Sequence, residues 1–241
     1  MNPELSVVIL CYWSGNGARA HAEHVRAVLL DAGIDDYQLV LVGNYVAGSD
    51  DTTPEVVRQL AADDPRIVCS TVAKQGMMGW DMRTGLALAT GNHLAVIDGD
   101  GQILAEDLVR VYRLLREQNL DLAKTYRTRR GDGLTRKLLS RVFNGIFHVL
   151  FPGLNVRDVN AKPKILTRAA YERLTLQSDD WFIDAEIMIQ ARRFGFRVGE
   201  VKTEFLGLTG RRSFVNLAAV AQFLRNLLRY RIRELRHRGK G

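Results

Sequence analysis

Apolar runs and amphipathic stretches alternate along the N-terminal part of the chain. Four short apolar runs are typical of buried strands: residues 5–13, 37–43, 66–72 and 93–98. The stretches between them have helical spacing and helix-ending signals, at residues 18–33, 52–65 and 79–91. Strands that alternate with helices in this way predict an α/β fold with a mostly parallel central sheet and helices on both faces.

The C-terminal part has a less regular pattern. Helical spacing returns in four stretches: residues 105–118, a segment that begins near Thr135, 167–174, and within 179–196. Residues 197–208 are typical of a strand, and from Val215 a long helix carries apolar residues with arginines between them. A chain of 241 residues suits one sizeable core. We therefore expect one domain over residues 1–213, followed by a basic amphipathic helix and tail over 214–241.

Composition and charge are typical of an ordinary globular protein with one basic end. Apolar residues make up 46% of the chain and charged residues 25%. Much of the net charge of +7 lies in Arg225–Gly241, which holds seven Lys or Arg and one Glu. A nearly neutral remainder argues against nucleic-acid binding by the core. Two cysteines make no disulfide framework, and the sequence lacks a signal peptide and a bilayer-spanning apolar run, so we expect a cytoplasmic protein.

The sequence AVIDGDGQ, residues 95–102, ends a predicted buried strand in two aspartates. Two neighbouring carboxylates repel each other unless a cation lies between them. Asp98 and Asp100, with Gln102 as a further oxygen donor, suit a hard divalent cation that keeps substrate phosphates among its ligands. Parallel α/β sheets bind ligands at the carboxyl ends of their strands, where this pair is expected. The alternative interpretation is a solvated turn.

Three chemistries are compatible with the aspartate pair. A phosphatase of the haloacid dehalogenase type also uses Asp-x-Asp after a strand, but it expects Thr or Val where this chain has Gln102. A dinucleotide site could use the glycines of residues 15–20, but Gly43 and Asn44 replace the acidic residue expected after the second strand. The third chemistry is sugar transfer from a nucleoside diphosphate sugar, in which a metal ion neutralises the leaving diphosphate.

The segment KQGMMGWDMRTGLALATGNHLAVIDGDGQILAEDLVRVYRLL, residues 74–115, resembles family 2 glycosyltransferases, and the resemblance extends over about residues 5–215. It is strongest to the branch of dolichol-phosphate mannose synthase. The resemblance implies the Rossmann-like glycosyltransferase A fold and a Mg²⁺ or Mn²⁺ ion held by Asp98, Asp100 and Gln102. It also implies an inverting transfer in which Asp100 takes part as a catalytic metal ligand.

The resemblance also implies binding residues for donor and acceptor. Six positions match the nucleotide-sugar site of the branch: Tyr12, Asn44, Gly76, Asp98, Arg211 and Arg212. Asn44 stands where the branch usually has a carboxylate, so the base, uracil or guanine, stays open. Arg136 and Ser140 match the residues linked to the acceptor phosphate. Their spacing of four places both on one helical face, and an arginine beside a hydroxyl suits a phosphate, although a solvated basic face is equally typical of such a cluster.

Asp184 and Glu186 match a stretch whose acidic residues face the acceptor in that branch. The two side chains point in different directions on a helix, so we expect at most one of them to face the site. A lipid phosphate is already an anion and can attack without strong base assistance, whereas a hydroxyl needs a general base, for which Asp184 is the first candidate. The pair of Arg136 and Ser140 favours a phosphate, so polyprenyl phosphate is the expected acceptor. A soluble hydroxyl acceptor and a non-catalytic sugar-nucleotide-binding module are the alternatives.

The basic C-terminal helix agrees with a lipid acceptor. Its arginines, Arg225, Arg229, Arg233 and Arg236, could lie on an anionic membrane surface. We therefore expect a cytoplasmic protein that binds peripherally to the inner face of the plasma membrane. Core packing or dimer packing of this helix is the alternative, and the oligomeric state stays open.

Overall fold

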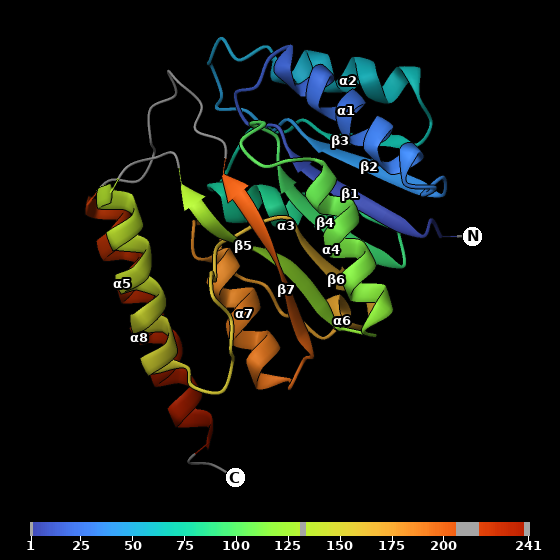
Figure 1. Ribbon diagram of the computed structural model, residues 1–241. Coiled ribbons are helices and arrows are strands. Elements are labelled where there is room, and N and C mark those ends of the chain that lie inside the picture. Colours follow the sequence, from blue (N-terminus) through green and yellow to red (C-terminus); the bar gives the residue numbers. More distant parts are fainter. Residues whose placement is uncertain (1, 131–133, 206–216, 239–241) are drawn as a thin grey trace.

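The computed structural model describes residues 2–130, 134–205 and 217–238, and within them seven strands form one sheet (Figure 1). The strands are β1 (Leu5–Leu10), β2 (Tyr37–Val42), β3 (Ile67–Ser70), β4 (His93–Asp98), β5 (Leu122–Arg130), β6 (Lys164–Thr167) and β7 (Val198–Phe205). Their order across the sheet is β3-β2-β1-β4-β6-β5-β7. The helices are α1 (Gly17–Asp31), α2 (Thr53–Asp63), α3 (Met78–Leu88), α4 (Glu106–Glu117), α5 (Leu134–Leu150), α6 (Arg168–Glu172), α7 (Ile183–Arg193) and α8 (Leu217–Arg238).

The sheet is mostly parallel, as the sequence predicts. β1 pairs in parallel with β2 and β4, and β2 pairs in parallel with β3. β6 runs antiparallel to both of its neighbours, β4 and β5, and β5 pairs in parallel with β7. The carboxyl ends of the parallel strands therefore meet at one edge of the sheet, and the beginning of β6 reaches that same edge.

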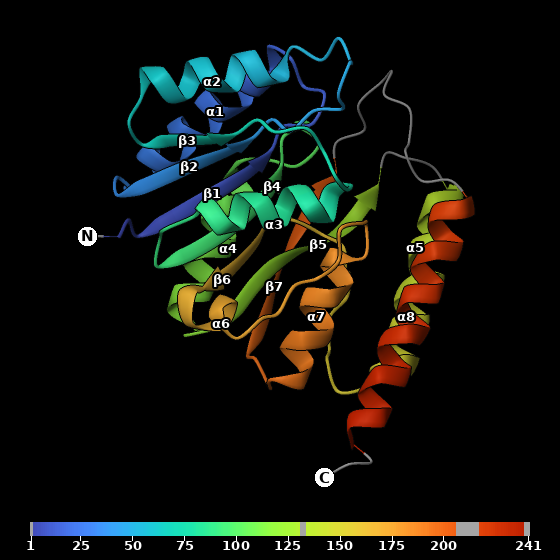
Figure 2. The same cartoon turned by 180° about the vertical axis from the view of Figure 1, so that it is seen from behind.

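Helices cover both faces of the sheet, which confirms the predicted architecture. Both views place α1, α2 and α4 over one face and α3, α6 and α7 over the other (Figures 1 and 2). Alternate residues of β1 fill the two cores, with Val7 and Ile9 on the α1 side and Val8 and Leu10 on the α3 side. The burial of β1 on both faces explains its continuous apolar sequence.

α5 and α8 lie side by side beyond α7 in both views (Figures 1 and 2). The rings of Phe143 in α5 and Phe223 in α8 have centroids 4.3 Å apart and pack edge to face. Arg192 of α7 contacts Glu234 of α8 at 2.7 Å between Nη1 and Oε1. These contacts attach the C-terminal helix to the rest of the domain through α7.

α8 presents one buried and one exposed apolar surface. Leu227 is fully buried towards the domain, whereas Leu228, Ile232 and Leu235 are 53%, 48% and 52% exposed. Among the described residues, no helix combines the length and the apolar character that crossing a bilayer requires.

Candidate active site

The aspartate pair lies in a tight turn at the carboxyl end of β4, a central strand of the sheet. Asp98 is the last residue of β4 and lies opposite Leu10 of β1. Gly99 follows, and a Cβ there would come within 2.8 Å of the Leu10 carbonyl oxygen, so only glycine fits. Gly101 has a φ of +71°, which favours glycine. The backbone amide of Gln102 donates to Asp100 Oδ1 at 3.0 Å. The glycines therefore shape the turn that presents the two carboxylates.

The donor set of this turn fits a hard divalent cation only in part. Asp98, Asp100 and Gln102 offer carboxylate and amide oxygens, the ligand type that Mg²⁺ and Mn²⁺ prefer. Among the described residues, no group of three His, Cys, Asp or Glu side chains comes together as a metal site. An ion bound at this turn would therefore draw its remaining ligands from water and from substrate, as is usual for ions that bind phosphates.

Lys162 contacts Asp98 of the aspartate pair, an interaction that the sequence does not predict. Because β6 runs antiparallel to β4 and Lys164 pairs with Val96, the register places Lys162 level with Asp98. The Lys162 ammonium lies 3.2 Å from Asp98 Oδ1 and 3.1 Å from Asp184 Oδ2. Burial alone would lower the pKa of Lys162, but the carboxylates of Asp184 and Asp98 raise it above its ordinary value.

Asp184 lies in the first turn of α7 and is shared by two lysines. It is 2% exposed and accepts from Lys162 and, through its other oxygen, from Lys164. Burial by itself would raise the pKa of Asp184, but the two ammonium groups hold it below its ordinary value. Asp98, Lys162, Asp184 and Lys164 thus form one ionic group, named here the Asp184 cluster.

Glu186 points away from this cluster and has a different partner set. Its carboxylate accepts from the backbone amides of Gln177 and Ser178 at 2.8–3.1 Å. It also accepts a hydrogen bond from the hydroxyl of Tyr230 in α8. Asp184 therefore contacts the strand-end site, and Glu186 attaches α8 and the loop before α7.

Further buried charges follow the Asp184 cluster along β5. Lys124 is fully buried, and its ammonium contacts Glu200 Oε1 at 2.9 Å and donates to the carbonyl oxygens of Thr125 and Asp158. Arg127 binds Asp158 with two nitrogens, at 2.7 and 2.9 Å. The C-terminal half of the sheet thus carries paired charges inside the fold.

A second polar group lies at the carboxyl ends of β1, β2 and β3. Asn44 accepts from Ser70 Oγ at 2.7 Å and donates to Asp81 Oδ1 at 3.0 Å. Lys74 pairs with the other oxygen of Asp81 and lies 4.1 Å from the centre of the Tyr12 ring. Burial raises the pKa of Asp81 in spite of this lysine. Tyr12, Asn44, Lys74 and Asp81 are named here the Asp81 cluster.

The structure brings some of the predicted donor and acceptor residues together and leaves others apart or undescribed. Gly76 packs against the protein, since a Cβ there would lie 2.7 Å from Trp80 Cβ and 2.9 Å from Asp179 Cβ. Arg136 and Ser140 both belong to α5, but their side chains lie outside the described part of the structure. The predicted Arg211 and Arg212 also lie outside the described residues. These assignments remain predictions.

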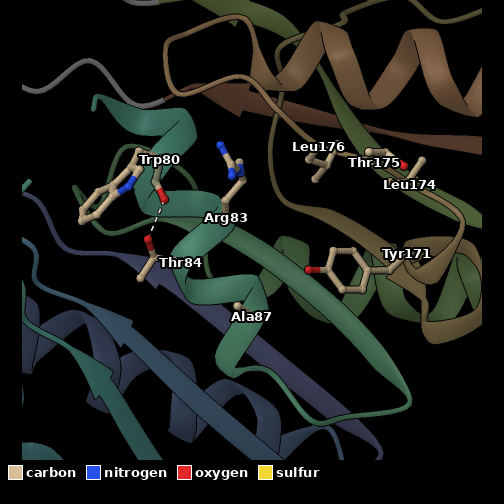
Figure 3. A pocket seen from close by; sticks show the side chains of 8 residues that line it. All are labelled: Trp80, Arg83, Thr84, Ala87, Tyr171, Leu174, Thr175 and Leu176. Atoms are coloured by element: carbon tan, nitrogen blue, oxygen red, sulfur yellow. Dashed lines mark hydrogen bonds between the residues drawn. The ribbon is translucent and has the colours of Figure 1, made fainter. Parts of the chain in front are cut away.

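A separate cavity of about 450 Å³ runs along the solvent side of α3 (Figure 3). Trp80, Arg83, Thr84 and Ala87 line it from the helix, and residues 171 and 174–176 line it from the segment at and after α6. None of the predicted site residues lines this cavity. The candidate active site is therefore the strand-end region.

The sequence contained one usable signal for Lys162 and Lys164. Two residues apart in an extended segment, they project from the same face of the chain. Their segment looked turn-rich, so β6 was not predicted and the register that brings them to Asp98 could not be worked out. Asp81 had no comparable signal, because its partner Asn44 comes from a strand end 37 residues earlier in the chain.

This chain belongs to glycosyl transferase family 2, whose model matches residues 6–181. The predicted family and the prediction of an enzyme, a glycosyltransferase, are thereby confirmed.

Curated relatives agree with the predicted branch. The glycosyltransferase AglD of Haloferax volcanii is 29% identical over 212 residues, which are 84% of this chain and 33% of that protein. A dolichyl-phosphate beta-glucosyltransferase of Trichomonas vaginalis is 23% identical over 222 residues, which are 83% of this chain and 66% of that protein. The chain therefore spans about a third of the first relative and just under two thirds of the second.

Solved structures share the fold. Glucosyl-3-phosphoglycerate synthase from Mycobacterium tuberculosis, in complex with phosphoglyceric acid, matches with a TM-score of 0.67 at 19% identity, covering 94% of this chain and 79% of that one. A mannosyltransferase from Pyrobaculum calidifontis, in complex with GDP-Man and Mn²⁺, matches with a TM-score of 0.55 at 17% identity, covering 87% and 59%. The predicted fold class is confirmed by these similarities together with the sheet order.

Proposed function

We propose that this glycosyltransferase moves a sugar from a nucleoside diphosphate sugar to a polyprenyl phosphate at a membrane surface, with inversion at the anomeric carbon. Relatives named dolichyl-phosphate beta-glucosyltransferases support the acceptor class. Structural neighbours solved with UDP-Glc and Mn²⁺, and with GDP-Man and Mn²⁺, support a UDP- or GDP-linked donor.

The strand-end turn is the proposed place of the leaving diphosphate. Asp98, Asp100 and Gln102 would hold Mg²⁺ or Mn²⁺, which supplies positive charge to the departing diphosphate. The two carboxylates are oriented before substrate binds, because the backbone amide of Gln102 orients Asp100 and the ammonium of Lys162 orients Asp98. The proposed nucleoside end is the Asp81 cluster, in which the Tyr12 ring and the Asn44 amide lie beyond β1 and β2.

The observation that carries the choice of acceptor is the buried pairing of Asp184. A general base must be able to take a proton, and a carboxylate that two ammonium groups hold below its ordinary pKa is a poor base at neutral pH. A sugar or alcohol acceptor would depend on such a base. A phosphate acceptor arrives as an anion and does not, so the pairing of Asp184 with Lys162 and Lys164 favours the phosphate.

The exposed side of α8 supports a membrane location. Leu228, Ile232 and Leu235 recur at helical spacing, so they form one apolar stripe on an exposed face. Arg225, Arg229 and Arg233 lie along the same exposed side of the helix. An apolar stripe bordered by arginines suits the interface of an anionic membrane.

The test is a transfer assay with labelled UDP- and GDP-linked hexoses, Mn²⁺, and two acceptors. One acceptor is polyprenyl phosphate in anionic phospholipid vesicles, and the other is a free polyprenol in the same vesicles. We expect extractable product from the phosphate and none from the alcohol. Asp98→Asn should lower the rate by at least about a hundredfold, because it removes a carboxylate ligand of the ion that would neutralise the departing diphosphate.

Two outcomes would overturn the proposal. Product from the alcohol at a similar rate would favour the hydroxyl alternative, and no turnover of any donor would favour the non-catalytic alternative. The membrane part has its own pair of variants. Leu228→Ser with Ile232→Ser should lower vesicle binding, whereas Leu30→Ser with Val72→Ser, which also removes two exposed apolar side chains, should not.

A further inference from the structure

Lys162 is a buried cation that contacts a predicted metal ligand. It is 3% exposed, and its ammonium lies between Asp98 Oδ1 and Asp184 Oδ2, at 3.2 and 3.1 Å. A third contact, 3.4 Å to Met78 Sδ, comes from the first residue of α3. Strand β4, the segment before β6, α7 and α3 thus meet at this one ammonium group.

We propose that Lys162 is a positioning residue that makes metal binding depend on the nucleoside diphosphate. This inference rests on the proposed function. The ammonium occupies one oxygen of Asp98 and leaves the other for the metal. It also adds a positive charge a few ångströms from the place of the ion. The ion and Lys162 repel each other until diphosphate oxygens bring negative charge to both.

Charge counting supports this dependence. Asp98 and Asp184 carry two negative charges, and the ammonium groups of Lys162 and Lys164 already balance them. A divalent ion alone would leave the site with excess positive charge. A diphosphate offsets that excess, and charges a few ångströms apart interact more strongly in a partly buried site than in water. Metal and nucleotide should therefore bind together more tightly than either binds alone.

Lys164 offers a matched comparison within the same cluster. It is as deeply buried as Lys162 and contacts the same carboxylate, Asp184. No contact joins its ammonium to Asp98, since its second partner is the carbonyl oxygen of Ala161 at 3.1 Å. A change at Lys164 thus tests general loss of positive charge, whereas a change at Lys162 also tests the contact with the metal ligand.

The experiment measures Mn²⁺ binding by electron paramagnetic resonance of the free ion, with and without UDP or GDP. For the unmodified protein we expect at least about tenfold tighter Mn²⁺ binding when the preferred diphosphate is present. Lys162→Met should bind Mn²⁺ alone about tenfold more tightly than the unmodified protein. With Mn²⁺ present it should bind the diphosphate more weakly. A mere packing defect would not produce these opposite shifts.

Control variants separate the possible failures. Lys164→Met should change the Mn²⁺ affinity less than threefold, roughly the factor expected of a more distant charge, and Lys162→Arg should restore the behaviour of the unmodified protein. Equal effects of Lys162→Met and Lys164→Met, or no coupling between Mn²⁺ and diphosphate in the unmodified protein, would overturn the inference. Asp98→Asn distinguishes this failure from that of the proposed function. If Asp98→Asn leaves Mn²⁺ binding unchanged, the metal site itself is wrong.

Discussion

In the Asp81 cluster one buried carboxylate serves a single lysine and a single amide, whereas in the Asp184 cluster one buried carboxylate serves two lysines, of which one also contacts Asp98. The first cluster is built from loops after parallel strands and one helix. The second depends on antiparallel β6, whose direction brings two lysines to the carboxyl end of β4. The comparison shows that a single reversed strand can bring two lysines, and thus positive charge, to the carboxyl end of β4.

The largest effect is expected for Asp184→Asn, which removes the charge shared by two buried ammonium groups. Breaking a buried ion pair from one side typically destabilises a protein by about 3–5 kcal/mol. Urea denaturation should show a loss of free energy of unfolding of this size. The matched control is Asp179→Asn, since Asp179 pairs with Arg83 at the surface and its side chain is 50% exposed.

The surface pair of Asp179 and Arg83 gives the reference loss of unfolding free energy for that comparison. Asp179→Asn should cost less than about 1 kcal/mol, as is usual for exposed ion pairs. Similar losses for the two variants would mean that burial adds nothing to the pairing of Asp184, and the contrast between the two clusters would fail.

An intermediate loss of unfolding free energy is expected in the Asp81 cluster, where the amide of Asn44 and the carboxylate of Asp81 can be exchanged. Asp81→Asn should cost about 2 kcal/mol, because buried Lys74 loses its charged partner. Asn44→Asp should also destabilise, because it places a second carboxylate beside Asp81. The double variant keeps one carboxylate, one amide and both hydrogen bonds, so we expect most of the stability to return.

The exchange is measured as a double-mutant cycle of unfolding free energies. The expected coupling energy exceeds about 1 kcal/mol in the stabilising direction, which is typical of residues in direct contact. Additive effects of the two substitutions would contradict the prediction. They would mean that Asn44 and Asp81 do not act as one unit.

The smallest effect, per pH unit, is a dependence of stability on pH in the alkaline range, which we expect from Lys164 of the Asp184 cluster. Burial, which outweighs the attraction of Asp184, lowers the pKa of Lys164 to about 8 from the usual 10.5. Between these values the unfolded chain binds more protons than the folded one, so stability rises with pH. The contribution of Lys164 is complete above about pH 10.5 and is lost as the pH falls through about 8.

The measurement compares the unmodified protein with Lys164→Met from pH 7.5 to 10. The difference in unfolding free energy should shift in favour of the unmodified protein by up to about 1 kcal/mol per pH unit. A constant difference across this range would show that Lys164 titrates alike in the folded and unfolded states. Burial would then not lower the pKa of Lys164 in the folded protein.

The sequence was sufficient for the part of the fold that follows simple patterns. The apolar runs of β1, β2 and β4 stood out because they are buried on both faces. The aspartate pair stood out because charges seldom follow such a run. By contrast, the sequence did not predict β5, because Lys124 is a lysine inside a sheet and lysine at a strand position usually indicates solvent. It did not predict β6, because that strand follows a segment rich in turn residues.

The contacts within the candidate site depend on strand register and on helix packing, which the composition of the chain does not reveal. Lys162 lies beside Asp98 only because β6 pairs with β4 in a particular alignment. Asp81 reaches Asn44 only because α3 packs closely beneath β1 and β2, where a Cβ at Gly85 would lie 2.4 Å from Val8 Cγ1 and 2.6 Å from Val42 Cγ2. Such pairings come from the assembled fold, and no local spacing in the chain predicts them.

The burial of the lysines has a consequence for how any reaction at β4 would begin. Lys162 and Lys164 are oriented by the fold, each at 3% exposure or less. In water, dipoles must reorient when a negative charge develops. These ammonium groups, by contrast, are already placed at the carboxyl end of β4 when the substrate enters. Folding has thus done in advance the ordering that solvent would otherwise do at each turnover.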